Sequence, residues 1–518
     1  MTAVVKIDSN TSGLRYAIEA SNGVLPGSPV WRALEPNSYG DFGGNVTTVA
    51  RQPINDGRQR KKGVVVDVEA SANFEVDMTQ DSHDDLFRGF MYAAYRKKAE
   101  IVNVTADTEI TDVSATTRDY TVSADGTDFV VGDILFASGF TNPGNNGLKN
   151  VNGSTGTTVS VDEALVDEAA PPVDAKIEVV GYTFGTAEVD VDATTNPLPR
   201  LVRASGAKDF TTFGLAPGEF IFVGGDPSAN KFVTAGNNGF MRVRSVAATY
   251  IEIDKSSGVM ADETGTGLDI QLFFGKVIKN EVAGTIARTT FQLERTLGAP
   301  DDSLPAAIQS EYIVGSIPNE ITFNIPSAEK LTTEMTFMGK DHETRSGTVG
   351  VKAGTRPTLV SGDAFNTSSD VTRVRMSVVS STDTYNAELF AFIMEASITI
   401  RNNNTRNQAV GTVGAFDHTA GTFEVGGEIT AYFTNVSALA AIRANSNVTL
   451  DIILAKNNAG YVIDIPLTTL AGGLAQLELN EAIKLPLSHE AAEATDITDT
   501  YNHTLMVVDF AYLPDAAQ

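Results

Sequence analysis

Alternation between apolar and polar residues is clearest over residues 289–340, and the rest of the chain is interpreted around this stretch. Every second residue is apolar from Ile321 to Ile325, and a similar alternation runs from Leu331 to Phe337 after a break at 326–330. Successive side chains of a strand point to opposite faces, so both runs are predicted strands. We therefore expect a hairpin with one face in a core and the other face polar.

The clearest helical pattern follows a predicted strand over residues 63–76. Ser82 precedes Asp85 by three residues, which is the spacing of a capping box and predicts the helix start. Acidic residues over 81–85 also raise the alternative of a metal cluster, but capping and the helix dipole already explain them. The residues that recur at helical spacing, and predict a stripe packed on a sheet, are Leu86, Phe87, Phe90, Met91 and Ala94.

An internal repeat occupies the middle of the chain. Each copy has a Gly-acidic-apolar strand, an Asn-Asn-Gly turn and a strand that ends in Asp. From the Val after the turn to the closing Asp, 162 − 151 and 254 − 243 both give 11 residues. Asn and Gly tolerate positive φ, so each turn is predicted to close a hairpin. We expect two small β modules inserted into one split β domain, with the segments 1–100, 101–180, 181–276 and 277–518.

Composition supports a mostly β fold and limits the compartment. Val, Thr, Ile and Phe dominate the periodic runs, and helical periodicity is scarce apart from a short predicted helix at 437–443. The 518 residues contain no cysteine and no long apolar run, so neither a disulfide nor a membrane span is expected. The first residues lack the apolar core of a signal peptide, which predicts synthesis and retention in a cytosol.

The search for chemistry is mostly negative. The chain has no phosphate-binding loop, nucleophile elbow or zinc-protease motif, and its five histidines show no ligand spacing. We therefore predict no catalytic, cofactor-binding or metal-binding residue, and no enzyme. The pairs Asp190/Asp192 and Asp496/Asp499 leave open a carbohydrate-active enzyme with two carboxylates.

Charge points away from nucleic-acid binding. The formal net charge is −27, whereas affinity for phosphates comes from Lys and Arg. This charge either keeps a large protein soluble or forms a surface that DNA passes without sticking. One basic cluster interrupts the acidic background, either as a solvated loop or as a contact to an acidic surface of a neighbouring copy; it contains Arg58, Arg60, Lys61 and Lys62.

Three stretches resemble the major tail tube proteins of bacteriophages with long, non-contractile tails, the siphophages. The first comprises residues 12–34, the loop 51–62 and the strand 66–78 before the helix. The second comprises Thr290-Phe-Gln-Leu-Glu-Arg, Gly315-Ser-Ile-Pro-Asn and Thr336-Phe-Met-Gly-Lys; the third runs from Gly426 to the C-terminus. The repeated modules look like extra domains that some tube proteins carry outside.

The resemblance implies a β-sandwich or half-barrel subunit whose sheet joins those of its neighbours. Six subunits would close a hexameric ring with a β-barrel lumen, and rings would stack through long loops such as 37–62 into a virion tail tube for DNA ejection and host cell entry. The implied partners are tape-measure, tail terminator and baseplate or distal tail proteins, besides passing DNA. The polar positions of the central hairpin are the expected lumen residues: Glu320, Thr322, Asn324 and Glu334.

A second class of protein stays open beside this one. A β-rich receptor-binding or decoration protein of a virion would use the repeated modules to bind glycans and would need no ring. Under the tube interpretation, the same modules would face outward and either reinforce the tube or adhere weakly to host surfaces. Glycan binding by residues 101–276 without assembly would favour the second class.

Overall fold

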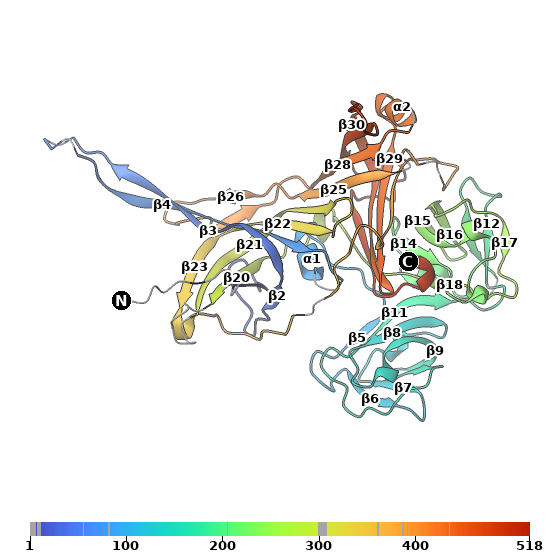
Figure 1. Ribbon diagram of the computed structural model, residues 1–518. Helices are drawn as coiled ribbons and strands as arrows, with labels where there is room; N and C mark the ends of the chain where they lie inside the picture. Colours follow the sequence, from blue (N-terminus) through green and yellow to red (C-terminus); the bar gives the residue numbers. More distant parts are fainter. Residues whose placement is uncertain are drawn as a thin grey trace.

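The computed structural model is mostly β, and the expected fold class is confirmed (Figure 1). Two α-helices lie in the described part, α1 (Asp84–Met91) and α2 (Ser437–Arg443), where a short helix is predicted. None of the helices in these ranges combines the length and the apolar character that crossing a membrane requires. The structure describes residues 7, 12–54, 56–57, 59–80, 83–204, 206–298, 308–359, 362–385, 388–390, 392–434 and 436–518, with only the backbone at 348.

The larger of two extended sheets combines both ends of the chain and forms what we call the split domain. Its strands are β1 (Gly13–Ile18), β2 (Arg32–Leu34), β3 (Pro36–Arg51), β4 (Lys61–Asp77), β19 (Lys276–Lys279), β20 (Phe291–Gly298), β21 (Gln309–Ile325), β22 (Thr332–Gly339), β23 (Asp341–Ser346), β24 (Val371–Val378), β25 (Ile393–Arg401), β28 (Glu424–Tyr432), β29 (Val448–Lys456), β30 (Ala459–Gly472), β31 (Lys484–Ala491) and β32 (Met506–Phe510). A small pair, β26 (Thr405–Asn407) and β27 (Asp417–Thr419), extends from the β25–β28 hairpin.

Eight antiparallel strands of the split domain pair side by side in the order β3-β4-β22-β21-β25-β28-β31-β30, and we call them the wall. The predicted central hairpin is β21–β22 in the middle of the wall, and Ile321, Phe323 and Ile325 are buried as expected. Phe323 lies against Phe87 of α1 at a ring distance of 5.7 Å. The wall therefore has an apolar face in the core and a polar face away from it.

Helix α1 departs from its predicted boundaries at both ends. Its N-cap is His83 with no side-chain cap hydrogen bond, so the capping box is wrong; Ser82 itself lies outside the described residues. Asp85 instead pairs with Arg32 at 2.7 Å. The helix ends at Met91 because Tyr92 adopts a left-handed conformation, and Ala94 is exposed beyond it. The other four predicted stripe residues are buried.

The stretch from 37 to 62, expected to be a long loop, is instead largely a strand in a projecting hairpin. Strands β3 and β4 pair from Pro36–Val76 out to Arg51–Lys61, and their distal half leaves the body of the molecule (Figure 1). We call residues 43–70 the arm. Residues 45–54 and most of 59–66 are exposed, on both faces of the ribbon, so this part of the arm lacks the alternation that marks a strand packed on a core.

The repeated segments form the second sheet, which module 1 (β5–β11) and module 2 (β12–β18) share. β11 of module 1 pairs with β18 of module 2, so the modules are continuous. The strands are β5 (Glu100–Val102), β6 (Ile110–Ser114), β7 (Asp119–Val122), β8 (Asp133–Ser138), β9 (Gly147–Thr155), β10 (Thr158–Val161), β11 (Lys176–Thr183), β12 (Val189–Asp192), β13 (Arg200–Arg203), β14 (Phe220–Val223), β15 (Gly239–Ala247), β16 (Tyr250–Lys255), β17 (Glu263–Thr264) and β18 (Gln271–Phe273).

The Asn-Asn-Gly segments do connect hairpin strands, but the two asparagines act through their side chains. Only Gly147 and Gly239 of these segments have positive φ. Asn145 holds Val166 and Glu168, and Asn237 makes the matching bonds to Ala261 and Glu263, all at 2.8–2.9 Å. The equal bonding shows the duplication at the level of single atoms.

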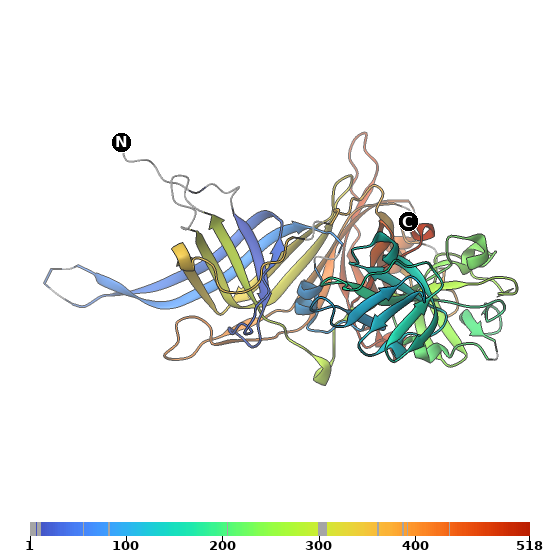
Figure 2. The same cartoon turned by 90° about the horizontal axis from the view of Figure 1, so that it is seen from below.

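The modules are packed against the split domain on the side opposite the arm (Figure 2). Chain entry and exit lie together, because Arg96 and Val277 exchange two backbone hydrogen bonds. One face of β29 and β30 contributes Ile452 and Ile463 to the core of the split domain. The opposite face packs Ile453 and Val462 into a cluster with aromatic residues of the modules, so the modules are anchored by burial.

Candidate assembly surfaces

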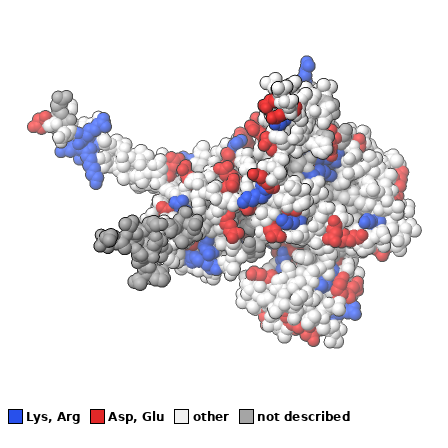
Figure 3. Space-filling model, viewed as in Figure 1, with Lys and Arg blue, Asp and Glu red and all other residues white. Residues whose placement is uncertain are grey.

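The predicted basic cluster lies at the end of the arm. Arg60, Lys61 and Lys62 are exposed there, while Arg58 lies outside the described residues. Figure 3 shows Lys and Arg gathered near the tip of the arm, far from the rest of the molecule. A second molecule that approaches from this end would therefore meet these cations before it meets the rest of the chain.

Exposed apolar side chains accompany the basic residues on the arm. Val46, Val49, Val64 and Val65 are each about half exposed, and the Ile54 side chain is fully exposed. Apolar residues on both faces of a two-stranded ribbon stay in contact with water until a partner molecule covers them. Such a surface therefore favours association. Alternation failed to reveal this surface, although the density of valine next to Arg and Lys was visible in the sequence.

The four predicted lumen residues lie together on the polar face of the wall. Glu320 pairs with Arg401 at 2.9 Å, and Thr322 is hydrogen-bonded to Thr399 across β21–β25 at 3.0 Å. Glu334 accepts a hydrogen bond from Asn73 at 2.9 Å. Asn324 shares their face because the side chains of a strand alternate. These contacts place the residues on one face of the wall, and their exposure to a lumen stays a prediction.

Outside the arm, five further glutamates share this face and were missed by the sequence analysis. Directly opposite residues on paired antiparallel strands share a face, and the register carries this from strand to strand. Glu334 lies opposite Glu75, and Thr399 opposite Gly426, which in turn lies opposite Glu490. Arg401 and Lys484 are the cations on this face in the described parts of β21, β22, β25, β28 and β31. These glutamates are Glu75, Glu395, Glu424, Glu428 and Glu490.

A buried ion network joins module 2 to the split domain. Arg242 contacts Asp254 at 2.8 Å and Asp464 of β30 at 3.1 Å, and all three side chains are almost fully buried. Burial acts to lower the pKa of Arg242, but the two carboxylates raise it well above its usual value. Burial raises the pKa of Asp464 despite the nearby guanidinium. The network holds the module in one orientation, because each charge has lost its water and depends on its partner.

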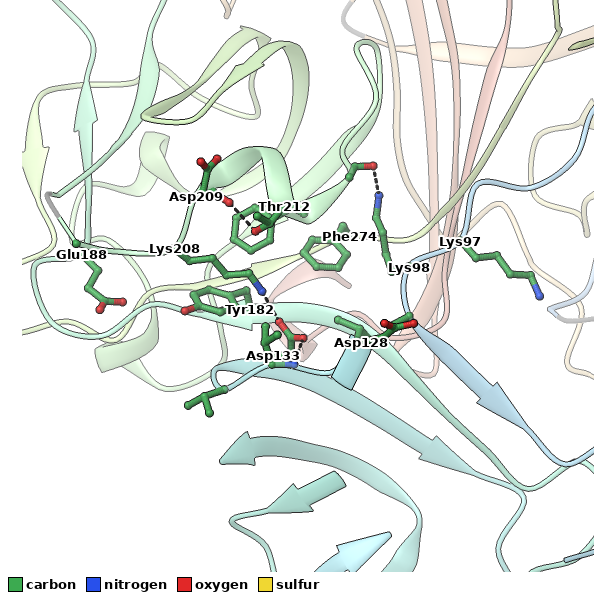
Figure 4. Close-up of a pocket in the computed structure, with 17 residues that line it drawn as sticks. Lys97, Lys98, Asp128, Asp133, Tyr182, Glu188, Lys208, Asp209, Thr212 and Phe274 are labelled. Atoms are coloured by element: carbon green, nitrogen blue, oxygen red, sulfur yellow. Dashed lines mark hydrogen bonds and ion pairs between the residues drawn. The ribbon is translucent and has the colours of Figure 1, made fainter. Parts of the chain in front are cut away.

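A cleft of about 880 Å³ separates the modules (Figure 4). Lys208 of module 2 pairs with Asp133 of module 1 at 2.8 Å, and Lys98 pairs with Glu219, the repeat equivalent of Asp133, at 3.1 Å. Burial raises the pKa of both carboxyls. The aromatic rings beside these lysines are buried, so the cleft presents no open ring face of the kind that stacks on sugars.

The carboxylates considered for glycoside hydrolysis are either engaged by nearby backbone groups or exposed. Asp190 accepts a hydrogen bond from the backbone of Gly265 at 2.9 Å. A hydrogen bond from the Thr195 backbone lowers the pKa of Asp192, which suits a turn rather than a proton donor. Asp496 and Asp499 are exposed. Over the described ranges, no group of three or more His, Asp or Glu side chains is arranged to hold a metal ion.

An eight-stranded wall with one acidic face, a projecting arm and two modules packed beside the split domain are features typical of a structural protein. A family model described as phage tail tube protein matches residues 9–501. The chain therefore belongs to the phage tail tube protein family, which makes it a component of the virion tail assembled from many copies and suggests a non-enzymatic protein. No curated protein matches the chain.

Proposed function

We propose that this protein is the subunit of a siphophage tail tube, which closes into rings with a six-fold wall and conducts DNA to the host. The acidic face of the wall carries the proposal. Eight antiparallel strands form a curved surface whose outermost strands can be extended by further copies, and closing the ring removes both exposed edges. Synthesis in the cytoplasm of the bacterial host and assembly into the virion follow from this role.

The polar face of the wall lines the lumen in this proposal. Glu320, Thr322, Asn324 and Glu334 face the passing DNA together with the five further glutamates. Carboxylates repel phosphates over a Debye length of about 8–10 Å, so DNA slides through without specific binding. The tape-measure protein would occupy the same lumen before ejection, and the terminator and baseplate or distal tail proteins would cover the two ends of the tube.

The arm forms the inter-ring contact. Arg58, Arg60, Lys61 and Lys62 engage acidic groups of the next ring, while the exposed valines are covered by it. Isolated basic residues on a solvated loop would not require these apolar neighbours. The arm therefore supplies both a charge contact and buried apolar area to ring stacking.

The modules face the exterior and reinforce the tube. The split-domain core separates them from the polar face of the wall, because β29 and β30 bury one face in that core and the other against the modules. We keep the four segments 1–100, 101–180, 181–276 and 277–518 as domain boundaries of this proposal. Glycan or receptor binding by the modules stays a prediction that the buried aromatic rings of the cleft do not favour.

Electron microscopy of the purified protein at high concentration, beside size-exclusion chromatography with light scattering, tests the assembly. We expect stacked rings or hollow tubes of uniform bore. A chain that stays monomeric at every concentration and binds a glycan array through a 101–276 fragment would contradict the proposal and favour a receptor-binding protein.

A further inference from the structure

The split domain contains the same unit twice, which the strand pairing shows and the sequence does not. The first unit has the order β1, β3, β4, α1, β20, β21, β22, β23, and the second has β24, β25, β28, α2, β29, β30, β31, β32. Every pairing within the first unit recurs in the second, including β3–β4 as β25–β28 and β21–β22 as β30–β31. The modules are inserted after the helix of the first unit.

Residue register makes the correspondence specific. Leu293 lies opposite Ile313 in β20–β21, and Leu450 lies opposite Ile465 in β29–β30. Each ladder also has a bulge at the same place, just before this pair: between Phe291 and Leu293 in β20, and between Val448 and Leu450 in β29. From β21 to β30 the numbers differ by 465 − 313, or 152, and β22 matches β31 with the same difference, 487 − 335. Unrelated hairpins would not share both register and bulge.

One strand pair, β21–β25, joins the two units inside the chain. Each outermost strand of the wall is equivalent to one member of that pair but has no such partner. β21 of the first unit pairs with β25 of the second over Glu320–Arg401 to Ile325–Ala396. The equivalent of β21 is β30, and the equivalent of β25 is β3. In the described part of the chain, β3 pairs with β4 alone, and β30 is not extended beyond Gly472.

The end of β30 shows what this missing partner does. The β21–β22 ladder contains an extra residue between Pro318 and Glu320 that the β30–β31 ladder lacks, so the difference in numbering is 151 beyond that point. Residues 473–476 therefore correspond to Thr322–Ile325. β25 holds Thr322–Ile325 in a strand, whereas 473–476 lie beyond the end of β30. Leu474 corresponds to Phe323 by this register. Phe323 is 2% exposed and Leu474 is 84% exposed. An apolar residue at a core position of the repeat is thus left uncovered where the single chain ends its wall.

We propose that the end of β30 pairs with β3 of a second copy in the way that β21 pairs with β25, and that three chains rather than six close the ring. This rests on the proposed assembly into rings. Ala471 takes the place of Glu320, since each lies opposite an equivalent residue, Ser488 or Thr336. Asn45 takes the place of Arg401, because Asn45 lies opposite Glu69 and Arg401 opposite Glu424. Ala471 of one copy therefore faces Asn45 of the next.

The width of the wall sets the number of chains. Strands about 4.8 Å apart and tilted by about 40° each occupy roughly 6 Å of circumference, so eight strands span about 50 Å. Three chains give a backbone diameter of about 48 Å and, after about 5 Å of side chains on each side, a bore of about 38 Å. Two chains leave about 22 Å, close to the width of a duplex, and six leave about 85 Å. Six units from three chains therefore match a DNA conduit.

Cysteine cross-linking tests both the pairing and the count, because the protein contains no cysteine. The variant Asn45→Cys/Ala471→Cys places two exposed residues at the proposed contact. Mild oxidation of assembled rings should yield covalent dimers and trimers and nothing larger on a non-reducing gel. Val46→Cys/Ala471→Cys is the matched control: Val46 is adjacent and exposed, but it points to the other face of β3.

Failure of the count and failure of assembly give different results. A ladder that extends to six chains, or equal cross-linking of the control pair, would overturn the inference while leaving the ring intact. Native mass spectrometry of unmodified rings checks the count without any substitution and should give three chain masses. Absence of rings in the unmodified protein would instead contradict the proposed function itself.

Discussion

At the scale of single residues, buried ion pairs hold the modules to the split domain, and separating them costs much free energy. Arg242 has both of its carboxylate partners within 3.1 Å and is itself buried. Asp451, also buried, pairs with Arg373 at 2.6 Å and with Lys255. Such groups stabilise the docked state only as complete sets, because an unpaired buried charge is costly.

Replacement of Arg242 should therefore destabilise the protein strongly. Arg242→Met keeps most of the side-chain volume but leaves Asp254 and Asp464 without the guanidinium, and we expect a loss of about 3–5 kcal/mol in the free energy of unfolding. Denaturant unfolding measures it. Arg200→Met in the same module is the control: its partially exposed pair with Glu252 should contribute about 1 kcal/mol or less. Equal losses would show that Arg242 is not an anchor.

Buried His503 should make the protein sensitive to acid. Burial, together with nearby Lys279 and Arg242, lowers the pKa of His503 to about 3. The unfolded chain binds this proton below about pH 6.5, so stability falls as the pH drops from 6.5 toward 3, by up to about 1.4 kcal/mol per pH unit. His503→Gln removes the titration, and its unfolding free energy should vary less over this window. An unchanged pH profile would assign the acid sensitivity to other groups.

At the scale of elements, strands with one buried face were predicted from the sequence, and strands exposed on both faces were missed. The β21–β22 hairpin was predicted because one face is buried and the other is polar, so apolar and polar residues alternate along each strand. The arm was missed because both faces of β3 are exposed, so no such period exists around Val46 and Val49. The lumen candidates were found on the central hairpin alone, since grouping Glu75 and Glu490 with them requires the strand register.

The repeated modules retain the same residues at matching positions, whereas the two copies of the wall unit do not. Asn145 and Asn237 keep identity because their side chains make the same hydrogen bonds. Glu320 and Ala471 occupy equivalent places in the wall but differ, because there the backbone ladder rather than the side chain carries the structure. Duplication of the wall unit therefore could not be predicted from residue identities.

Charge reversal on the arm should separate stacking from ring closure. Lys61→Glu/Lys62→Glu places four units of altered charge at the tip, and we expect rings that no longer stack at physiological salt. Lys97→Glu, a single charge reversal on an exposed residue near the modules, should leave tube length unchanged. Electron microscopy measures tube length, and tubes of normal length from the arm variant would remove the basic cluster from the inter-ring contact.

At the scale of the whole molecule, the acidic wall face should keep DNA from binding. Glu334→Lys/Glu490→Lys reverses two exposed residues of that face, and assembled tubes should gain affinity for duplex DNA that weakens with salt, by a log–log slope of about 0.9 per added phosphate contact. Asp128→Lys/Asp269→Lys makes the same change on exposed positions of the modules. A DNA affinity that rises as much in this control as in the wall variant would contradict a lumen at the wall.

The most direct test of the account is a cryo-electron microscopy reconstruction of assembled tubes. We predict a bore lined by the polar face of the wall, with Glu320 and Glu334 toward the axis, the arm of each ring on the next ring, and both modules outside. A bore lined by residues of the modules, or a wall whose polar face looks outward, would contradict it.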